Sequence, residues 1–412
     1  FPDALTFAEA FRQSVAGRLD LATIIAQPPV PIDVVNPYKG LRAFQETDAL
    51  DFYGRDSLIG QLLEHLSGGR FVAVVGPSGS GKSSVVKAGV IPALRRGAIP
   101  GSEKWFVAEM TPGTHPLEEL EQALWPVAVE PPPSLVEPML RDPGGMLRTI
   151  RRILPDEEDA KLLLVIDQFE ELWSQTSPER RAYFLDSLLA ALSAPHSPLH
   201  VIVTLRADFY DRPLQVQPLA ELVKQQTEVV LPLNQDELTW AIQEPARRLG
   251  VEYEEGVLPA IVSEVYDQPG TLPLLQYALT ELFDARSGNQ ITRQAFDEVG
   301  GVLRALPRRA DEIYENLSPS EQVAARQLFL RLVTLGEGVE DTRRRVRLSE
   351  LEALDLENDP AADGASSIEG IVDQFGAARL LTFDHDPLTR QPTVEVAHEA
   401  LLREWGQLRT WL

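Results

Sequence analysis

The sequence predicts an α/β fold, in which a parallel sheet carries helices on both faces and is followed by a helical lid domain and a winged-helix domain. Three apolar runs indicate buried strands, at Phe71–Val75, Leu162–Ile166 and Pro198–Arg206. Apolar runs without alternation are typical of parallel strands that are covered on both faces. Two further strands of the sheet are expected at Lys104–Met110 and Val229–Leu233.

The length of the chain, 412 residues, is too great for one hydrophobic core. We expect residues 1–35 to be the end of an upstream domain and a linker. Residues 36–234 should form the domain with the sheet, 235–335 the helical domain and 336–412 the winged-helix domain. The chain starts with Phe1 and shows no signal peptide, so we expect it to be a piece of a longer protein.

The charge and composition of the chain argue against several classes of partner. The net charge of −24 disfavours binding to nucleic acid and to anionic membranes. No apolar run is long enough to span a membrane. The chain has no cysteine, so it has no disulfide and no cysteine metal site, which suits a cytoplasmic location. A site for an anionic ligand would have to be a local positive spot in this negative field.

A glycine-rich loop between the first strand and a helix is the main chemical motif. It matches G-x-x-x-x-G-K-[ST], the signature of P-loop NTPases, in the expected context. Its backbone N–H groups and the helix N-terminus should bind phosphate oxygens of ATP or ADP. Lys82 should reach the β- and γ-phosphates, and the Ser83 hydroxyl should bind Mg²⁺. The predicted binding residues are Gly76, Pro77, Ser78, Gly79, Ser80, Gly81, Lys82, Ser83 and Ser84.

Acidic residues follow the strand Leu162–Ile166, about 85 residues after the loop. Asp167 ends that strand, at the edge where ligands bind in open α/β sheets, and can hold Mg²⁺ through water. Glu170 is placed to orient or activate the attacking water, and Glu171 is the second candidate for this role. Spacing and context together predict a site for hydrolysis of a nucleoside triphosphate.

Two further candidates come from the ends of other elements. Arg206 ends a strand and would face the γ-phosphate, although it could instead pair with Asp208 or Asp211. Tyr53, Gly54 and Arg55 lie about 20 residues before the loop. An aromatic-Gly-Arg sequence at this position often packs on the adenine in related ATPases, and the alternative is a simple turn before a helix.

Two candidates lie far along the chain. Pro273 could pack on the nucleotide base or could simply start a helix. His398 lies between a predicted strand at Thr393–Val396 and a predicted helix at Glu399–Leu412. A single histidine there is often a helix cap or a core residue, and no second histidine stands beside it to form a metal site. The helix and hairpin before it indicate a winged helix, but the acidic charge argues against DNA binding.

The order of these motifs resembles the STAND class of signalling ATPases. The stretches NPYKGLRAFQETDALDFYGR, LVIDQFEELW, TLRADFY and VEVAHEALLREW look similar to the bacterial novel STAND group over roughly residues 36–412. The resemblance implies that His398 contacts the β-phosphate of ADP, that Pro273 lines the adenine pocket and that Arg206 senses the γ-phosphate. Compared with NACHT proteins, Gln168 replaces a small residue and Glu170 replaces an aspartate.

The resemblance also implies a function. Members of the class bind ATP and Mg²⁺, hydrolyse ATP slowly, are held closed by ADP and oligomerise when activated. In the class, an effector domain lies upstream. The sequence of residues 1–13 resembles the last helix of some bacterial Ser/Thr kinases. A sensor array, such as a WD-repeat propeller, lies downstream. The alternatives are a AAA+-like remodelling ATPase and a winged-helix transcription regulator.

Overall fold

A computed structural model describes residues 35–129, 134–155, 160–268, 270–335, 341–351, 368–385, 389 and 391–412. Residues 37–412 form one compact unit, and the account below concerns that unit. The expected helix and linker of residues 1–34 lie outside the described residues.

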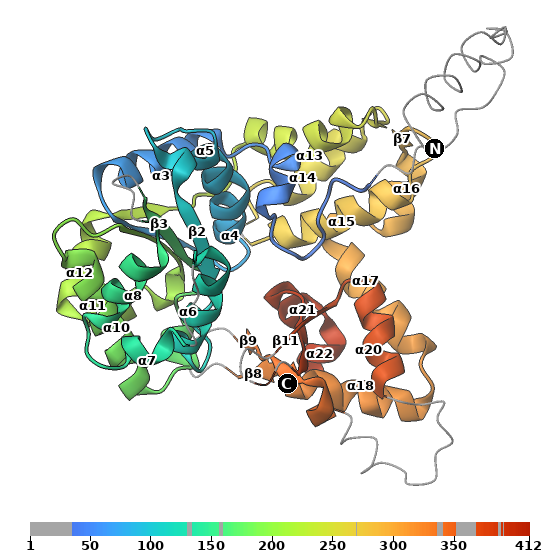
Figure 1. The fold of residues 1–412 in the computed structure, drawn as a ribbon. Coiled ribbons are helices and arrows are strands. Elements are labelled where there is room, and N and C mark those ends of the chain that lie inside the picture. Colours follow the sequence, from blue (N-terminus) through green and yellow to red (C-terminus); the bar gives the residue numbers. More distant parts are fainter. Residues whose placement is uncertain are drawn as a thin grey trace, which may run out of the picture. The chain divides into compact units, whose positions relative to one another are not determined.

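Five parallel strands form the central sheet (Figure 1), as the sequence predicts. They are β1 (Phe71–Gly76), β2 (Phe106–Met110), β3 (Leu162–Ile166), β4 (Leu199–Arg206) and β5 (Thr227–Val229), in the order β2-β3-β4-β1-β5. Every residue of β1, β3 and β4 is buried, which accounts for their continuous apolar sequence.

The predicted last strand, Val229–Leu233, is wrong in its bounds. The strand β5 ends at Val229, and only the N–H of Val230 still reaches β1, donating to the carbonyl of Val75 at 2.8 Å. Beyond that point β1 turns into the glycine-rich loop after Gly76, so no paired backbone is left for residues 231–233.

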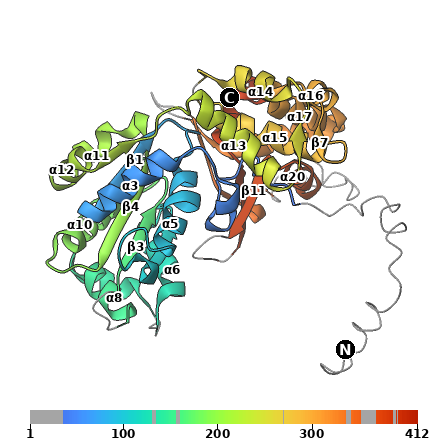
Figure 2. The same cartoon turned by 90° about the horizontal axis from the view of Figure 1, so that it is seen from above.

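Helices cover both faces of the sheet (Figure 2), as predicted. Successive residues of a strand point to opposite faces, so β1 contributes to two cores. Val72 and Val74 pack with leucines of α3 (Asp56–Gly68). Phe71, Ala73 and Val75 belong to the other core. Helices of that core include α6 (Pro116–Leu124), α8 (Gly145–Ile153), α10 (Pro178–Ser193) and α12 (Gln217–Gln225).

The helix after the glycine-rich loop has three consecutive parts, α4 (Lys82–Ser84), the wider turn η2 (Val85–Val90) and α5 (Ile91–Arg95). The backbone is right-handed helical across both junctions, so the predicted helix is continuous. Short elements complete this region: η1 (Glu46–Asp51), η3 (Ser102–Lys104), η4 (Trp125–Val127), α7 (Val136–Met139), α9 (Glu171–Ser174), η5 (Ala207–Phe209) and α11 (Asp211–Leu214).

Mainly helical structure follows the sheet. The helices are α13 (Gln235–Arg248), α14 (Val257–Val265), α15 (Leu272–Asp284), α16 (Arg293–Val299), α17 (Val302–Asn316) and α18 (Pro319–Arg331), with a short strand pair of β6 (Glu252–Tyr253) and β7 (Gln290–Ile291). Capping boxes at Asn234 and Ser318 satisfy free backbone N–H groups and so start α13 and α18.

The last part of the chain, residues 341–412, is called the C-terminal segment below. Its antiparallel sheet has the order β10 (Val346–Arg347), β12 (Pro392–Val396) and β11 (Leu381–His385). A further pair joins β9 (Thr342–Arg343) to β8 (Val333–Thr334). The helices are α20 (Ile368–Ala377), α21 (Glu399–Glu404) and α22 (Gly406–Trp411). A helix before a two-stranded hairpin is the arrangement that the sequence predicts.

The single helix predicted at Glu399–Leu412 is interrupted by Trp405, whose backbone is extended. The indole of Trp405 is fully buried, packs edge-on against Phe329 and donates from Nε1 to the carboxylate of Asp311 at 2.7 Å. The free energy gained by burying this large ring against neighbouring elements exceeds the free energy lost by interrupting the helix.

Candidate nucleotide site

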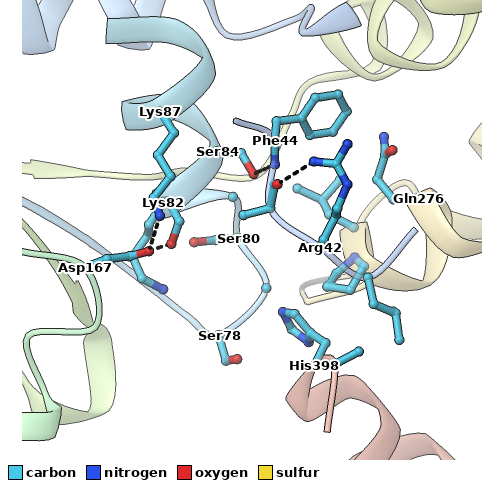
Figure 3. Close-up of a pocket in the computed structure, with 18 of the residues that line it drawn as sticks. Arg42, Phe44, Ser78, Ser80, Lys82, Ser84, Lys87, Asp167, Gln276 and His398 are labelled. Atoms are coloured by element: carbon cyan, nitrogen blue, oxygen red, sulfur yellow. Dashed lines mark hydrogen bonds and ion pairs between the residues drawn. The ribbon is translucent and has the colours of Figure 1, made fainter. Parts of the chain in front are cut away.

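A cavity of about 490 Å³ lies where the sheet, the helix α15 and the C-terminal segment meet. Its volume is in the range of small-molecule sites. Most of the residues predicted from sequence line it: Tyr53, Arg55, Ser78, Gly79, Ser80, Gly81, Lys82, Ser83, Ser84, Asp167, Glu170, Arg206, Pro273 and His398. Gly54, Gly76, Pro77 and Glu171 are not among its lining residues. Figure 3 shows part of this lining.

The loop of residues 76–83, called the phosphate loop below, needs its glycines. Gly79 and Gly81 have φ values of 75° and 90°, which side chains disfavour. A Cβ atom on Gly79 would also lie 2.9 Å from Cγ of Pro273. The Nζ of Lys82 donates to the carbonyls of Gly76 and Pro77 at 3.0 and 2.8 Å. The main chain is thus held curled around the lysine.

The two predicted metal ligands, Ser83 and Asp167, are in contact. The Oγ of Ser83 donates to Oδ1 of Asp167 at 2.6 Å, and Oγ1 of Thr204 donates to the same atom at 2.6 Å. Burial raises the pKa of Asp167, but nearby Lys87 and the two hydroxyls lower it by a larger amount, so the net shift is downward. An ionised carboxylate beside a hydroxyl is a hard oxygen set that fits Mg²⁺.

Lys87 is a site residue that our sequence analysis missed. Its Nζ lies 3.3 Å from Oδ2 of Asp167 and 3.2 Å from Oε2 of Glu109. The available signal was its spacing, because Lys87 follows Ser83 by four residues on one helix and therefore shares its face.

The structure separates the two glutamates after Asp167. Glu170 lines the cavity, is 6% exposed, and its carboxylate accepts from the backbone N–H of Arg206 at 3.2 Å. Burial raises the pKa of Glu170 to about 7, a value suited to a general base. Glu171 faces elsewhere, and its carboxylate accepts from the N–H of Gly113 at 3.0 Å. Burial raises the pKa of Glu171 to about 8.

Arg206 lines the cavity and also makes the pairing that the sequence left open. Its Nε and Nη2 donate to the two carboxylate oxygens of Asp208 at 3.0 and 2.8 Å. This bidentate contact orients the guanidinium at the carboxyl end of β4. Burial lowers the pKa of Arg206, but nearby carboxylates, chiefly that of Asp208, raise it by more, so the pKa is raised overall.

The stretch before α3 divides into lining and supporting residues. Tyr53 lines the cavity, whereas a Cβ atom on Gly54 would lie 2.4 Å from the carbonyl oxygen of Glu237, so Gly54 allows α13 to approach. Arg55 donates to the carbonyls of Leu231 and Ser80 at 2.8 and 3.2 Å and so supports the phosphate loop.

Residues 40–45 also line the cavity and were missed by the sequence analysis. The N–H of Phe44 donates to Oγ of Ser84 at 3.2 Å, which ties this stretch to the helix after the phosphate loop (Figure 3). Arg42 pairs with Asp48 at 2.6 Å. Backbone contacts of this kind carry no distinctive sequence signal.

His398 is both a helix cap and a lining residue. Its Nδ1 accepts from the N–H of Ala400 at 3.0 Å, which starts α21. Burial lowers its pKa to about 4, so the ring is neutral at pH 7. A neutral ring that accepts at Nδ1 carries its proton on Nε2. In Figure 3 the ring extends from the C-terminal segment toward the phosphate loop.

The charge of the lining differs from the expected positive spot. Among the described lining residues, the cations and the carboxylates are equal in number. The cations are Arg42, Arg55, Lys82, Lys87, Arg206 and Arg343, and the carboxylates are those of Asp51, Asp167, Glu170, Asp384, Glu395 and Glu399. The charge of the lining is therefore balanced, although the chain as a whole is acidic. Several of the cations are also paired with carboxylates.

The fold and the phosphate loop define the chain as a P-loop NTPase. A model of the family described as Novel STAND NTPase 1 matches residues 37–412. The chain belongs to this family, which confirms the resemblance to novel STAND proteins. Nucleotide binding follows from that membership.

Other comparisons concern curated proteins and solved structures. No curated protein matches the chain. The chain resembles a Walker-type ATPase of Pyrococcus abyssi, with 11% identity, a TM-score of 0.40 and coverage of 88% of this chain and 98% of that one. It also resembles Cdc6p from Pyrobaculum aerophilum, with 11% identity, a TM-score of 0.42 and coverage of 87% and 93%. A third similar structure is the Aeropyrum pernix ORC2 protein in its ADP form, with 17% identity, a TM-score of 0.40 and coverage of 83% and 88%.

None of the helices in the described ranges is both long enough and apolar enough to cross a membrane.

Proposed function

We propose that this NTPase is a signalling switch that binds and slowly hydrolyses ATP, is held closed by ADP and oligomerises on activation to control an attached effector. One observation carries the proposal: His398 of the C-terminal segment and Lys82 of the phosphate loop line the same cavity. A nucleotide there would touch both parts of the chain and could favour the closed arrangement by differential binding.

The proposed hydrolysis assigns a role to each polar side chain. Lys82 and Arg206 would stabilise the charge that develops on the phosphate oxygens. Glu170, with its raised pKa, would accept a proton from the attacking water. Ser83 and Asp167 would hold Mg²⁺, which when bound neutralises charge on the phosphates. Glu171 remains the weaker candidate, because it binds Gly113 and does not line the cavity.

The lock on ADP is assigned to several contacts. The Nε2–H of His398 would donate to a phosphate oxygen and contribute about 1.5–3 kcal/mol. A nearly complete switch needs about 5.5 kcal/mol of differential affinity. Packing must supply the rest, for example at Pro273 beside Gly79, and where Arg403 donates to the carbonyl of Gly270 at 3.1 Å.

The proposal extends to parts of the protein beyond the site. We propose that residues 36–234 form the nucleotide-binding domain, 235–335 the helical domain and 336–412 the winged-helix domain, which closes the site. Pro273 would line the pocket for the nucleotide base. We propose that an effector domain before this chain and a sensor array such as WD repeats after it complete the switch in the cytoplasm. The sequence of residues 1–13 favours a kinase-like effector.

The test is the identity and retention of bound nucleotide. Denaturing the purified protein should release stoichiometric ADP. His398→Ala should release ADP about 10- to 100-fold faster than the wild type, the loss expected for one hydrogen bond to a charged group. His398→Ser is the matched control for folding, because serine still caps α21, and it should release ADP as fast as His398→Ala.

Other outcomes would overturn the switch. Unchanged ADP release in His398→Ala would remove the histidine from the lock. An empty site with fast ATP turnover would indicate a AAA+-like remodelling ATPase. DNA binding with a steep salt dependence would indicate a winged-helix regulator.

A further inference from the structure

Gln168, directly after the metal ligand Asp167, has a left-handed backbone with φ of 54°. A residue with a Cβ atom is disfavoured in this region, because the Cβ approaches the following carbonyl oxygen. The conformation is held in part by the backbone N–H of Gln168, which donates to Oγ1 of Thr204 at 2.9 Å. Such a backbone persists only where its surroundings hold it, and it often marks a functional turn.

The side chain of Gln168 connects two parts of the chain. With its amide oriented so that both groups have partners, its oxygen accepts from Nη2 of Arg343 at 2.8 Å. Its nitrogen then donates to the carboxylate of Glu171 at 3.2 Å. The amide thus joins the turn of residues 167–171, called the acidic turn below, to the C-terminal segment.

Arg343 is anchored at its other nitrogens. Nη1 donates to the carbonyl of Ala397 at 3.2 Å and lies 3.6 Å from the carboxylate of Glu395. Nε lies 3.4 Å from the carboxylate of Glu399. These three partners flank His398 in sequence, so the guanidinium is fixed to the backbone that presents the histidine. The planar fork of arginine allows these contacts at the same time as the contact to Gln168.

We propose that Arg343 is a positioning residue that acts through Gln168 on the acidic turn. Closure of the C-terminal segment then holds Asp167 and Glu170 in place directly, in addition to any contact made through the nucleotide. The proposal rests on the proposed switch and deepens it, because it names the protein contact by which the closed segment controls the metal ligand and the base.

The experiment is a double-mutant cycle on ADP release, followed with a fluorescent ADP analogue. Gln168→Gly removes the amide and suits the left-handed backbone. Arg343→Lys keeps a cation beside Glu395 and Glu399 but loses the fork. Each variant should release ADP about tenfold faster than the wild type, the scale of one hydrogen bond to a charged group. The double variant should be no faster than either single variant, because both remove one link.

A second readout does not depend on ADP retention. Hydrogen exchange of the backbone amides of residues 162–174 should be faster in Arg343→Lys than in the wild type, while exchange in β1 stays the same. Rate factors that multiply in the double variant, or unchanged exchange in Arg343→Lys, would overturn the link. If the wild type itself retains no ADP, the proposed switch fails, and the exchange experiment alone decides on the link.

Discussion

The phosphate loop and the C-terminal segment line one cavity, but they are built in different ways. The loop is contiguous in sequence, and its shape comes from Gly79 and Gly81 between a buried strand and a helix. The C-terminal segment contributes individual side chains, chiefly Arg343 and His398, which stand far from the loop in sequence. Contacts such as Arg343 with Gln168 hold these side chains at the site.

This difference suggests that binding and retention of nucleotide are separable. The local backbone of the loop should bind phosphate wherever the sheet is folded. In the proposed switch the contacts of the C-terminal segment exist only in the closed arrangement, so they should slow release without being needed for binding. The four predictions below concern the loop and the residues beside it, to which this comparison assigns binding and hydrolysis.

The largest effect on nucleotide binding is expected from the loop. Lys82→Ala should weaken ATP binding about 100-fold or more, because it removes the buried cation that we propose contacts the phosphates. Isothermal titration with ATP measures the change. Lys224→Ala, an exposed lysine on α12, is the control and should bind as the wild type does. Binding by Lys82→Ala at wild-type affinity would contradict the assignment of the loop.

A second prediction concerns hydrolysis. Glu170→Gln should lower kcat by about 10²- to 10⁴-fold while ADP binding stays within a few-fold of the wild type. Glu171→Gln is the matched control, because its side chain can still accept from Gly113, and it should keep most of the activity. Equal losses in both variants would contradict the separation of the two glutamates.

The raised pKa of Glu170 predicts that the rate of hydrolysis depends on pH. Burial raises the pKa of Glu170 to about 7, and only the ionised form can accept a proton. The kcat/KM of the wild type should therefore fall about tenfold for each pH unit below about pH 7. A profile measured from pH 5.5 to 8.5 checks this; a flat acidic limb would remove Glu170 as the base.

The smallest effect is expected at Lys87. Removing this cation beside Asp167 and Glu109 leaves the metal site more negative, so Lys87→Met should need several-fold less Mg²⁺. The same change should weaken binding of Mg²⁺-free nucleotide. Titrating Mg²⁺ at constant ATP measures both effects, with Lys224→Met as control. A higher Mg²⁺ requirement would mean that Lys87 supports the metal ligands instead of competing with the metal.

Sequence patterns predicted the elements that depend on neighbouring residues. The strands β1 and β3 and the phosphate loop are confirmed, because burial on both faces requires continuous apolar residues and the loop requires its glycines. The hairpin of β11 and β12 also lies where it was predicted. The break at Trp405 was not predictable, because it depends on a pocket that includes Phe329, well away in sequence.

The sequence by itself determined the class of protein, the phosphate loop and the approach of Asp167 to it, since parallel strands bring their carboxyl ends to one edge. Only the tertiary structure decided which side chains meet there. It separated Glu170 from Glu171, made Gly54 a contact for α13, placed Lys87 beside the predicted metal ligand Asp167 and joined Gln168 to Arg343. The physical reason is that local patterns govern backbone conformation and burial, whereas pairing between distant charged groups depends on how separate elements pack.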